Sequence, residues 1–267
     1  AVMAGTSVVQ MFVAGIVPGL LAAFGFMGLC YWYALKYNWP VEQIFQWGKL
    51  WRAFKKAFWA LTLPIIILGG IFGGIVTATE GAALAVVASL LVGGLVYREL
   101  DWGRLREAII DGAVQTGAVM LLVASSALLG LYLTEVQLPQ KIAAAMLSVT
   151  SEKWAILAIL NVFFLVIGMF LHSAAAIILV VPIVMPVVTA AGIDPVHFGV
   201  IVTLNLAIGQ QTPPVASVLL LTCSIAKESV GDVTKANIPF IGVLIFTLLL
   251  VTYVPVVTLG LVSIFYR

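Results

Sequence analysis

Two polar interruptions of apolar sequence, about 40 positions apart, are the first candidates for chemistry in this chain. The later interruption consists of Gly209, Gln210, Gln211, Thr212, Pro213 and Pro214. Because proline lacks a backbone N–H and disfavours helical geometry in the residue before it, we expect a helix to end near Gln211. The last carbonyl groups of that helix would lack intrahelical partners, and they form the negative end of its dipole. With the Thr212 hydroxyl and the glutamine side chains, they predict oxygen ligands for a dehydrated hard cation.

The chain is expected to resume as a second half-helix directly after this interruption. That half-helix would start at a proline, which is favoured at the first helical position, and its free N–H groups could face a carboxylate. The alternative is a proline kink that only shapes helix packing. A polar run as long as Gly209 to Pro214 inside a span favours the functional interpretation.

The earlier interruption joins two apolar arms, residues 154–171 and 174–190. Each arm is short for a full membrane span, which takes about 20 apolar residues. A re-entrant hairpin would accommodate both arms, provided that its tip lines a cavity or is buried in protein. The pattern therefore predicts a hairpin that turns at His172-Ser173.

The tip of this hairpin offers a second set of candidate residues, Leu171, His172, Ser173 and Ala174. The first arm would end with free carbonyl groups, and the small side chain of Ala174 would permit close backbone approach at the start of the next helix. Two broken helices that meet at their tips would form a cation site with an anion site beside it. His172 could instead be only a polar residue at a helix end. No acidic residue lies nearby to orient a Ser–His pair, so the sequence does not favour an enzyme.

A third candidate lies between two earlier apolar arms and contains Thr77, Thr79 and Glu80. Glu80 is the only acid between Glu42 and Glu99, and a carboxylate in a membrane region suggests a functional site. However, Glu80 opens the second arm, so Thr77 or Thr79 could cap a helix that has Glu80 in its first turn. Capping and ion coupling both remain open.

Composition defines the class of protein that must position these residues. Of the 267 residues, 63% are hydrophobic and 9% are charged, and the mean hydropathy is +1.19. These values exclude a soluble globular domain, a disordered chain and an outer-membrane barrel, and they predict an all-α polytopic membrane protein with six to eight spans. The formal net charge of +2 gives no reason to expect a nucleic-acid partner. Cys30 and Cys223 lie in apolar runs and are expected to pack as small hydrophobes, and the two histidines have no partners at zinc-ligand spacing.

The expected elements follow from hydropathy and charge. A first span, 8–33, precedes the most basic stretch of the chain, where 42–58 is expected to form an amphipathic helix at the cytoplasmic membrane surface. A solvated basic loop is the alternative for this stretch. Apolar arms 58–76 and 81–96 and a span at 112–133 come next. The hairpin, the broken helix and a final span at 238–264 follow. The stretches 135–153 and 227–235 are expected to be connections.

Several stretches of the chain resemble one membrane-protein family. They are GGIVTATEGAA (73–83), SAAAIILVVPIVMP (173–186), GIDPVHFG (192–199), NLAIGQQTPPVA (205–216) and the closing TYVPVVTLGLVS. Their order and spacing are similar to the large membrane subunit of tripartite ATP-independent periplasmic (TRAP) transporters. The resemblance covers nearly the whole chain. Many family members carry Asp where this chain has His172 and Pro where it has Ala78, and they are considerably longer.

The resemblance implies a fold of the elevator type with two inverted repeats, of which this chain would hold the end of the first and all of the second. It implies five parts: a last span of the first repeat (1–40), an amphipathic arm (41–57), scaffold spans (58–153), a transport-domain hairpin with its broken helix (154–235) and a final span (236–267). The missing N-terminal repeat of the same subunit would supply the other half of the transport site.

The resemblance also implies function. The subunit would take up an organic acid together with Na⁺, bound through Ser173, Thr212 and backbone carbonyl groups, and would need no other cofactor. C4-dicarboxylates, sialic acid, sugar acids and keto acids all fit. The partners would be a small membrane (Q-type) subunit, a periplasmic substrate-binding protein and the lipid bilayer of the bacterial inner membrane. The alternatives are a proton-coupled carrier or channel, with Glu80 or His172 as the proton site, and a non-transporting scaffold subunit.

Overall fold

The computed structural model describes residues 1–38, 45–150 and 152–266, and these are helical with no β-strand among them. Seven helices are long and apolar enough to cross a membrane: α1 (Val8–Lys36), α2 (Trp47–Phe72), α3 with the following π-helical turn η2 (Ala78–Leu91 and Val92–Val96), α4 (Trp102–Glu135), α6 (Lys153–Phe170), α7 (Ser173–Ala190) and α10 (Val230–Tyr253). The shorter helices are η1 (Val2–Ala4), α5 (Leu138–Val149), α8 (Pro195–Gly209), α9 (Ser217–Ala226) and α11 (Val256–Phe265). The prediction of an all-α polytopic membrane protein is confirmed.

The predicted hairpin and broken helix correspond closely to the observed helices. α6 and α7 reproduce the two arms to within one residue, and α8 ends at Gly209, two residues before the expected position. Other predicted elements are fused. The amphipathic stretch 42–58, of which 42–44 lie outside the described residues, continues into the next apolar arm as one helix, α2. The expected connection at 135–153 contains α5.

The prediction of one continuous final span at 238–264 is wrong. α10 ends at Tyr253 and α11 begins at Val256, because Pro255 has no backbone N–H to continue the helix. The expected connection at 227–235 is also shorter than predicted. α10 already starts at Val230, where the hydroxyl of Ser229 accepts a hydrogen bond from the N–H of Asp232 at 3.2 Å.

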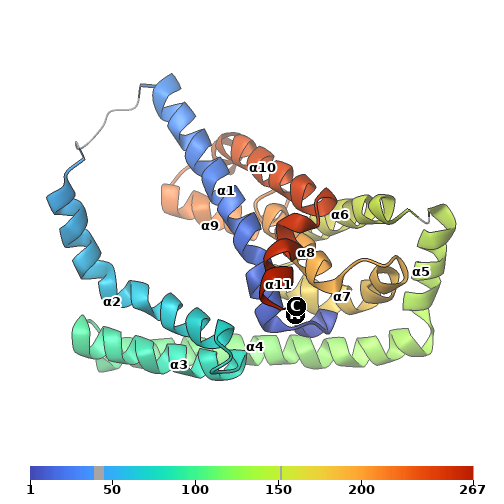
Figure 1. Cartoon of the computed structure of the whole chain (residues 1–267), viewed down its shortest axis with the longest axis horizontal. Helices are drawn as coiled ribbons and strands as arrows, with labels where there is room; N and C mark the ends of the chain where they lie inside the picture. The colour runs from blue at the N-terminus through green and yellow to red at the C-terminus, as the bar shows by residue number, and fades with distance from the viewer. Residues whose placement is uncertain (39–44, 151, 267) are drawn as a thin grey trace. The chain divides into compact units, whose positions relative to one another are not determined.

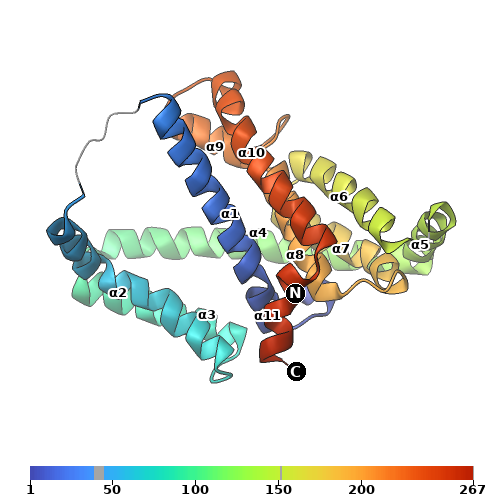
Figure 2. The same cartoon turned by 45° about the horizontal axis from the view of Figure 1, so that its top comes forward.

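The chain forms two compact units, Ala1–Asn38 with Val119–Arg267, and Trp39–Ala118. In the first unit α8 is the central helix. It packs against α6, α7, α10, α1 and α11, and Phe198, Ile201 and Leu206 on it are almost fully buried. Figures 1 and 2 both show α1 lying alongside α10. The core of this unit therefore surrounds the first half of the broken helix.

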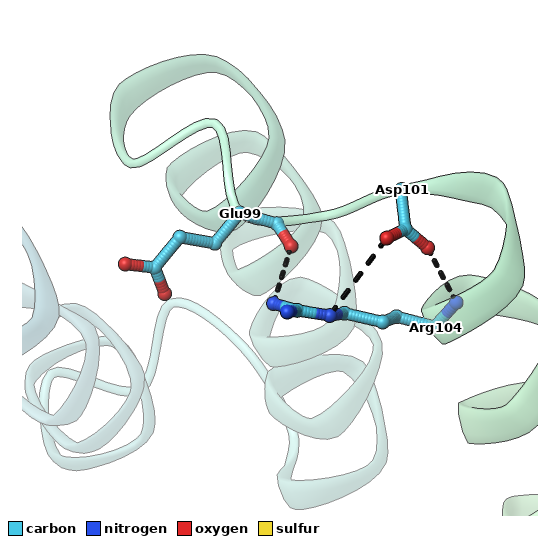
Figure 3. Close-up of polar contacts among 3 residues, drawn as sticks. All are labelled: Glu99, Asp101 and Arg104. Carbon is cyan, nitrogen blue, oxygen red and sulfur yellow. Dashed lines mark hydrogen bonds and ion pairs between the residues drawn. The ribbon is translucent and has the colours of Figure 1, made fainter.

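In the second unit α2 packs against α3 where glycine leaves room for a neighbour. A Cβ on Gly81 would lie 2.9 Å from Cδ1 of Ile71, so the isoleucine occupies the space of the missing side chain. The Tyr97 hydroxyl donates to the carbonyl of Lys56 and links η2 to the middle of α2. The start of α4 is held by a compact polar corner (Figure 3). Asp101 Oδ1 accepts from the N–H of Arg104 at 2.8 Å, and Arg104 Nη1 donates to the carbonyl of Glu99 at 2.9 Å.

Candidate functional site

Two helices of the first unit end in direct backbone contact. α6 and α8 pack side by side, and their C-terminal ends meet at Gly168 and Gly209. A Cβ on Gly209 would lie 2.5 Å from the carbonyl carbon and 2.6 Å from Cα of Gly168, a separation that only glycine permits. Because both helices point the same way at this contact, the negative ends of two helix dipoles lie together.

The starts of two further helices lie at the same place. Ser173 opens α7, and its Oγ accepts a 2.6 Å hydrogen bond from Nε2 of Gln210. The N–H groups of Val215 and Ala216, just before α9, donate to the carbonyl of Met169 at 3.3 and 3.5 Å. We call this meeting of four helix ends the tip site and define it by Leu171, His172, Ser173, Ala174, Gly209, Gln210, Gln211, Thr212, Pro213 and Pro214. It joins two negative and two positive dipole ends.

The carbonyl groups at the end of α8 are hydrogen-bonded, contrary to the expectation. The prediction that they lack partners is wrong, because the chain after Gly209 curls into a turn whose N–H groups point back. The carbonyls of Leu206, Ile208, Gly209 and Gln210 accept from the N–H groups of Gln210, Gln211, Thr212 and Val218, respectively, at 2.9–3.2 Å. The oxygens of Leu206, Gly209 and Gln210 each keep a second lone pair that could contact a cation, whereas that of Ile208 also accepts from the Thr212 hydroxyl.

The end of α6 fits the expectation of free carbonyl groups. The carbonyls of Ile167 and Met169 are hydrogen-bonded to backbone N–H groups. Within the described part of the chain, the carbonyls of Gly168, Phe170 and Leu171 accept no hydrogen bond. These oxygens and Ser173 Oγ are therefore the acceptors with most capacity for a ligand.

The polar side chains of the tip site do not all point the same way. Ser173 and Gln210 face each other, and the half-buried Thr212 turns its hydroxyl back to donate to the carbonyl of Ile208 at 2.9 Å. The Gln211 side chain instead faces α10, where Nδ2 of Asn237 lies 3.4 Å from its Oε1. The structure thus brings Ser173 and Gln210 together, turns the Thr212 hydroxyl back onto α8 and directs the Gln211 side chain towards α10.

His172 caps a helix. Its Nδ1 accepts from the N–H of Ala174 at 3.4 Å, and α7 begins directly after it, at Ser173. The imidazole is otherwise exposed. The interpretation of His172 as a polar residue at a helix end is therefore supported, and its exposure keeps it accessible to a ligand.

The second half of the broken helix does not start at a proline, so that prediction is wrong. Pro213 and Pro214 form an exposed turn with a cis peptide bond between them. Ala216 then adopts a left-handed backbone with φ of 44°, and α9 starts only at Ser217. The prolines lie before the helix because the chain must first reverse against Met169.

Thr77, Thr79 and Glu80 lie in the second unit at the start of α3. The Glu80 carboxylate accepts from the N–H and the hydroxyl of Thr77 at 2.7 and 2.9 Å, and the N–H of Glu80 donates back to the Thr77 hydroxyl at 3.3 Å. This reciprocal pair is a capping box. The capping interpretation is confirmed, and Thr79 has no part in it.

Sequence reasoning missed a line of buried polar residues beside the tip site. Nδ2 of Asn205 on α8 donates to Oδ1 of Asn161 on α6 at 2.7 Å, and Nδ2 of Asn161 lies 3.0 Å from the hydroxyl of Thr252 on α10. Near the other end of α8, Nδ1 of the buried His197 lies 2.7 Å from the hydroxyl of Thr258 on α11. The sequence signal that could have revealed these residues was a single amide or imidazole side chain within an otherwise apolar stretch.

The fold and the tip site define the class of protein. Discontinuous helices whose ends meet at a polar point inside a multi-pass bundle are typical of secondary transporters. Comparison with known families then identifies the chain. Residues 1–257 match the model of the DctM component of tripartite ATP-independent periplasmic transporters, and the chain belongs to this family. The predicted resemblance is confirmed, as is the prediction that the chain is not an enzyme.

Curated relatives include three that are named by what they transport. The chain is 40% identical to the isethionate TRAP transporter permease protein DctMQ of Oleidesulfovibrio alaskensis, over 96% of this chain and 40% of that protein. It is 36% identical to the C4-dicarboxylate TRAP transporter large permease protein DctM of Vibrio cholerae, over 93% of this chain and 59% of that protein. It is 33% identical to the sialic acid TRAP transporter permease protein SiaT of Haemophilus influenzae, over 95% of this chain and 41% of that protein. The chain therefore spans about 40% to 60% of the length of these relatives.

Proposed function

We propose that this chain is the C-terminal part of a TRAP transporter large permease and supplies one half of a Na⁺-coupled site for an organic anion. The observation that carries the proposal is the meeting of four helix ends at the tip site, two of each polarity. Helix C-terminal ends and unwound carbonyls coordinate cations in transporters of this architecture, and helix N-terminal ends face anionic groups. Family membership supports the same assignment.

The cation would bind at the ends of α6 and α8. The free carbonyls of Gly168, Phe170 and Leu171 and the hydroxyls of Ser173 and Thr212 are neutral oxygen ligands. A site without a carboxylate suits a monovalent ion, because a divalent ion usually recruits several charged ligands. Na⁺ is accordingly the proposed coupling ion.

The organic anion would bind beside the cation, at the starts of α7 and α9. Relatives are named for C4-dicarboxylate, 2,3-diketo-L-gulonate, sialic acid and isethionate, which makes a carboxylate the leading choice and a sulfonate the alternative. The sequence has no Lys or Arg between Lys153 and Lys227. A full positive charge for the anion would therefore come from the first repeat, which lies in the part of the relatives that this chain does not span.

The proposed transport cycle moves the hairpin and the broken helix together across the bacterial inner membrane, in the elevator manner. α6 and α8 are suited to move as one body, because their tips touch through backbone and Asn161 and Asn205 join them again nearer the middle. A small membrane subunit would brace the scaffold, and a periplasmic binding protein would deliver the anion. The name DctMQ of one relative supports the first of these partners.

A thermal melt of the full-length membrane complex in NaCl and in matched KCl or choline chloride tests the proposal. Bound Na⁺ stabilises the native state by mass action, so we expect a higher Tm in NaCl only. Thr212→Val should reduce that Na⁺-dependent shift. Thr203→Val is the matched control, because the Thr203 hydroxyl makes the same back-bond to a carbonyl of α8, at 2.8 Å, away from the tip. Thr212→Ser, which keeps the hydroxyl, should retain the shift.

Two outcomes would contradict the proposal. A Tm that responds equally to Na⁺, K⁺ and choline in a complex containing both repeats would favour proton coupling, with the exposed His172 as the first residue to test. Uptake that is unaffected by Thr212→Val and by apolar replacement of Gln210 would favour a non-transporting scaffold.

A further inference from the structure

The N-terminal half of α2 carries an exposed aromatic stripe. Trp47, Trp51, Phe54 and Phe58 recur at helical spacing and so share one face of the helix. The rings of Trp51 and Phe54 stack with centroids 5.6 Å apart, and those of Phe54 and Phe58 are 6.1 Å apart. The exposed fractions range from 75% for Trp47 to 43% for Phe58. Ile67 and Ile71, which pack against α3 at Gly81, lie in the other half of α2, and the four rings of the stripe remain exposed.

Basic side chains accompany this stripe without acidic ones. Between Phe45 and Phe58 the sequence holds four basic residues and no acid. Three of them are Arg52, Lys55 and Lys56, and none of these three forms an ion pair with any residue that the structure describes. Nζ of Lys55 lies 5.8 Å from the centroid of the Trp51 ring, so one cation sits directly beside the stripe. Arg52, Lys55 and Lys56 therefore present positive charge that no ion pair among the described residues neutralises.

We propose that Trp47, Trp51, Arg52, Phe54, Lys55, Lys56 and Phe58, the α2 basic–aromatic surface, bind anionic phospholipid headgroups. Tryptophan and other aromatic side chains prefer the headgroup level of a bilayer. Lys and Arg on an amphipathic helix add electrostatic attraction to anionic lipids. A protein partner is the weaker choice, because the positive charges of Arg52, Lys55 and Lys56 complement a negatively charged bilayer surface. This surface is independent of the tip site and of its ion.

Lipid binding at this surface has a defined consequence for the second unit. The Tyr97 hydroxyl donates a hydrogen bond to the carbonyl of Lys56. The same hydroxyl oxygen accepts one from the N–H of Ala60 at 3.4 Å. Headgroups that hold α2 at the membrane surface therefore also fix the position of η2. The α2 basic–aromatic surface would anchor this scaffold unit to an anionic bilayer surface.

The test measures how the full-length membrane complex in detergent responds to added phosphatidylglycerol and phosphatidylcholine, by thermal melt and by native mass spectrometry of retained lipid. We expect phosphatidylglycerol to be retained and to raise Tm, and phosphatidylcholine to do neither. Removing the three charges with Arg52→Gln, Lys55→Gln and Lys56→Gln should weaken phosphatidylglycerol binding on the order of 100-fold, at about fivefold per basic residue near the surface. High salt should weaken the wild-type interaction.

Two further variants make the result specific. The matched control removes three exposed basic residues elsewhere, with Arg106→Gln, Lys227→Gln and Lys235→Gln, and should bind phosphatidylglycerol as the wild type does. A charge-retaining variant, Arg52→Lys with Lys55→Arg and Lys56→Arg, should also retain binding. The proposal would be overturned if the complex responded equally to phosphatidylglycerol and phosphatidylcholine. It would also be overturned if the control variant lost as much phosphatidylglycerol binding as the charge-removed variant. Loss of the small membrane subunit from the charge-removed complex, with phosphatidylglycerol retention unchanged, would overturn it in favour of a protein partner.

Discussion

Replacing Gly209 by alanine should separate the two helix ends that form the cation half of the tip site. The new Cβ would lie 2.5 Å from the carbonyl carbon of Gly168 and 2.9 Å from the backbone nitrogen of Met169. These neighbours are backbone atoms, so no side-chain rotation can relieve the overlap. α6 and α8 must move apart at their tips.

The size of that movement follows from van der Waals contact distances. Carbon atoms in contact lie about 3.5–4.0 Å apart, so the pair must open by about 1 Å. Overpacking of this kind costs about 1–3 kcal/mol. Functional sites need their ligands held within about 0.5 Å, so the movement should also weaken Na⁺ binding by about tenfold or more, which corresponds to about 1.4 kcal/mol.

Thermal melts of the full-length complex across a NaCl series, at constant ionic strength with KCl, measure both effects. Gly209→Ala should lower Tm in KCl, and the Na⁺-dependent rise in Tm should require higher Na⁺ concentrations. Gly168→Ala should show the same pattern more weakly, because its Cβ would lie 3.1 Å from Cα of Gly209. The order of the two variants is therefore part of the prediction.

A matched control separates the tip contact from glycine replacement in general. Gly199 lies in the same helix, and its added Cβ would meet only the flexible end of Met11. Gly199→Ala should therefore leave the Na⁺ response unchanged. Should Gly209→Ala match Gly199→Ala in both Tm and Na⁺ response, the contact of α6 with α8 would have no role in ion binding, and the reasoning above would be refuted.

Three further variants test the packing around the site, each by thermal melt against the wild-type complex. Asn161→Leu should destabilise more than Asn205→Leu, because it breaks the side-chain bonds to both Asn205, which keeps only its bond to the carbonyl of Ile201, and Thr252, at about 1–3 kcal/mol for each group left unsatisfied; the reverse order would contradict the assigned bonds. Thr258→Val should cost about 1–3 kcal/mol by removing the partner of buried His197, and Thr258→Ser should not; equal effects would exclude that bond. Thr77→Ala should cost about 0.5–2 kcal/mol through the lost cap of α3 and leave the Na⁺ response intact; a lost response would return Glu80 to the list of ion-coupling residues.

Proline alone did not predict where these membrane helices break. α8 ends at Gly209, a few residues before Pro213, and Pro255 ends α10 where one continuous span was predicted. Pro182 and Pro186 lie inside α7 without ending it. In a membrane, neighbouring helices and local adjustments can satisfy the carbonyl that a proline leaves free. The outcome thus depends on tertiary surroundings, and only the polar residues around Pro213 made that break predictable.

The residues of the tip site were predictable as a set, and their geometry was not. Polar residues in apolar sequence marked Ser173, Gln210 and Thr212. The direction of each side chain depends on residues far along the chain, such as Asn237, which turns Gln211 towards α10. Glycine is equally ambiguous, because only close approach distinguishes Gly209 from most of the 24 glycines in the chain. Contacts between segments more than 25 residues apart leave no periodic pattern to read.

The two halves of the tip site are unequally complete, and this inequality bears on the order of binding. The cation half has free carbonyls and two hydroxyls from this chain. The anion half has only the starts of α7 and α9, each worth about half a positive charge, and no Lys or Arg between Lys153 and Lys227. If Na⁺ binds as proposed, it would be the first full positive charge beside the anion within this unit. Because coupling between two ligands is reciprocal, the anion would then strengthen Na⁺ binding by the same factor, and the pair would be bound and carried together.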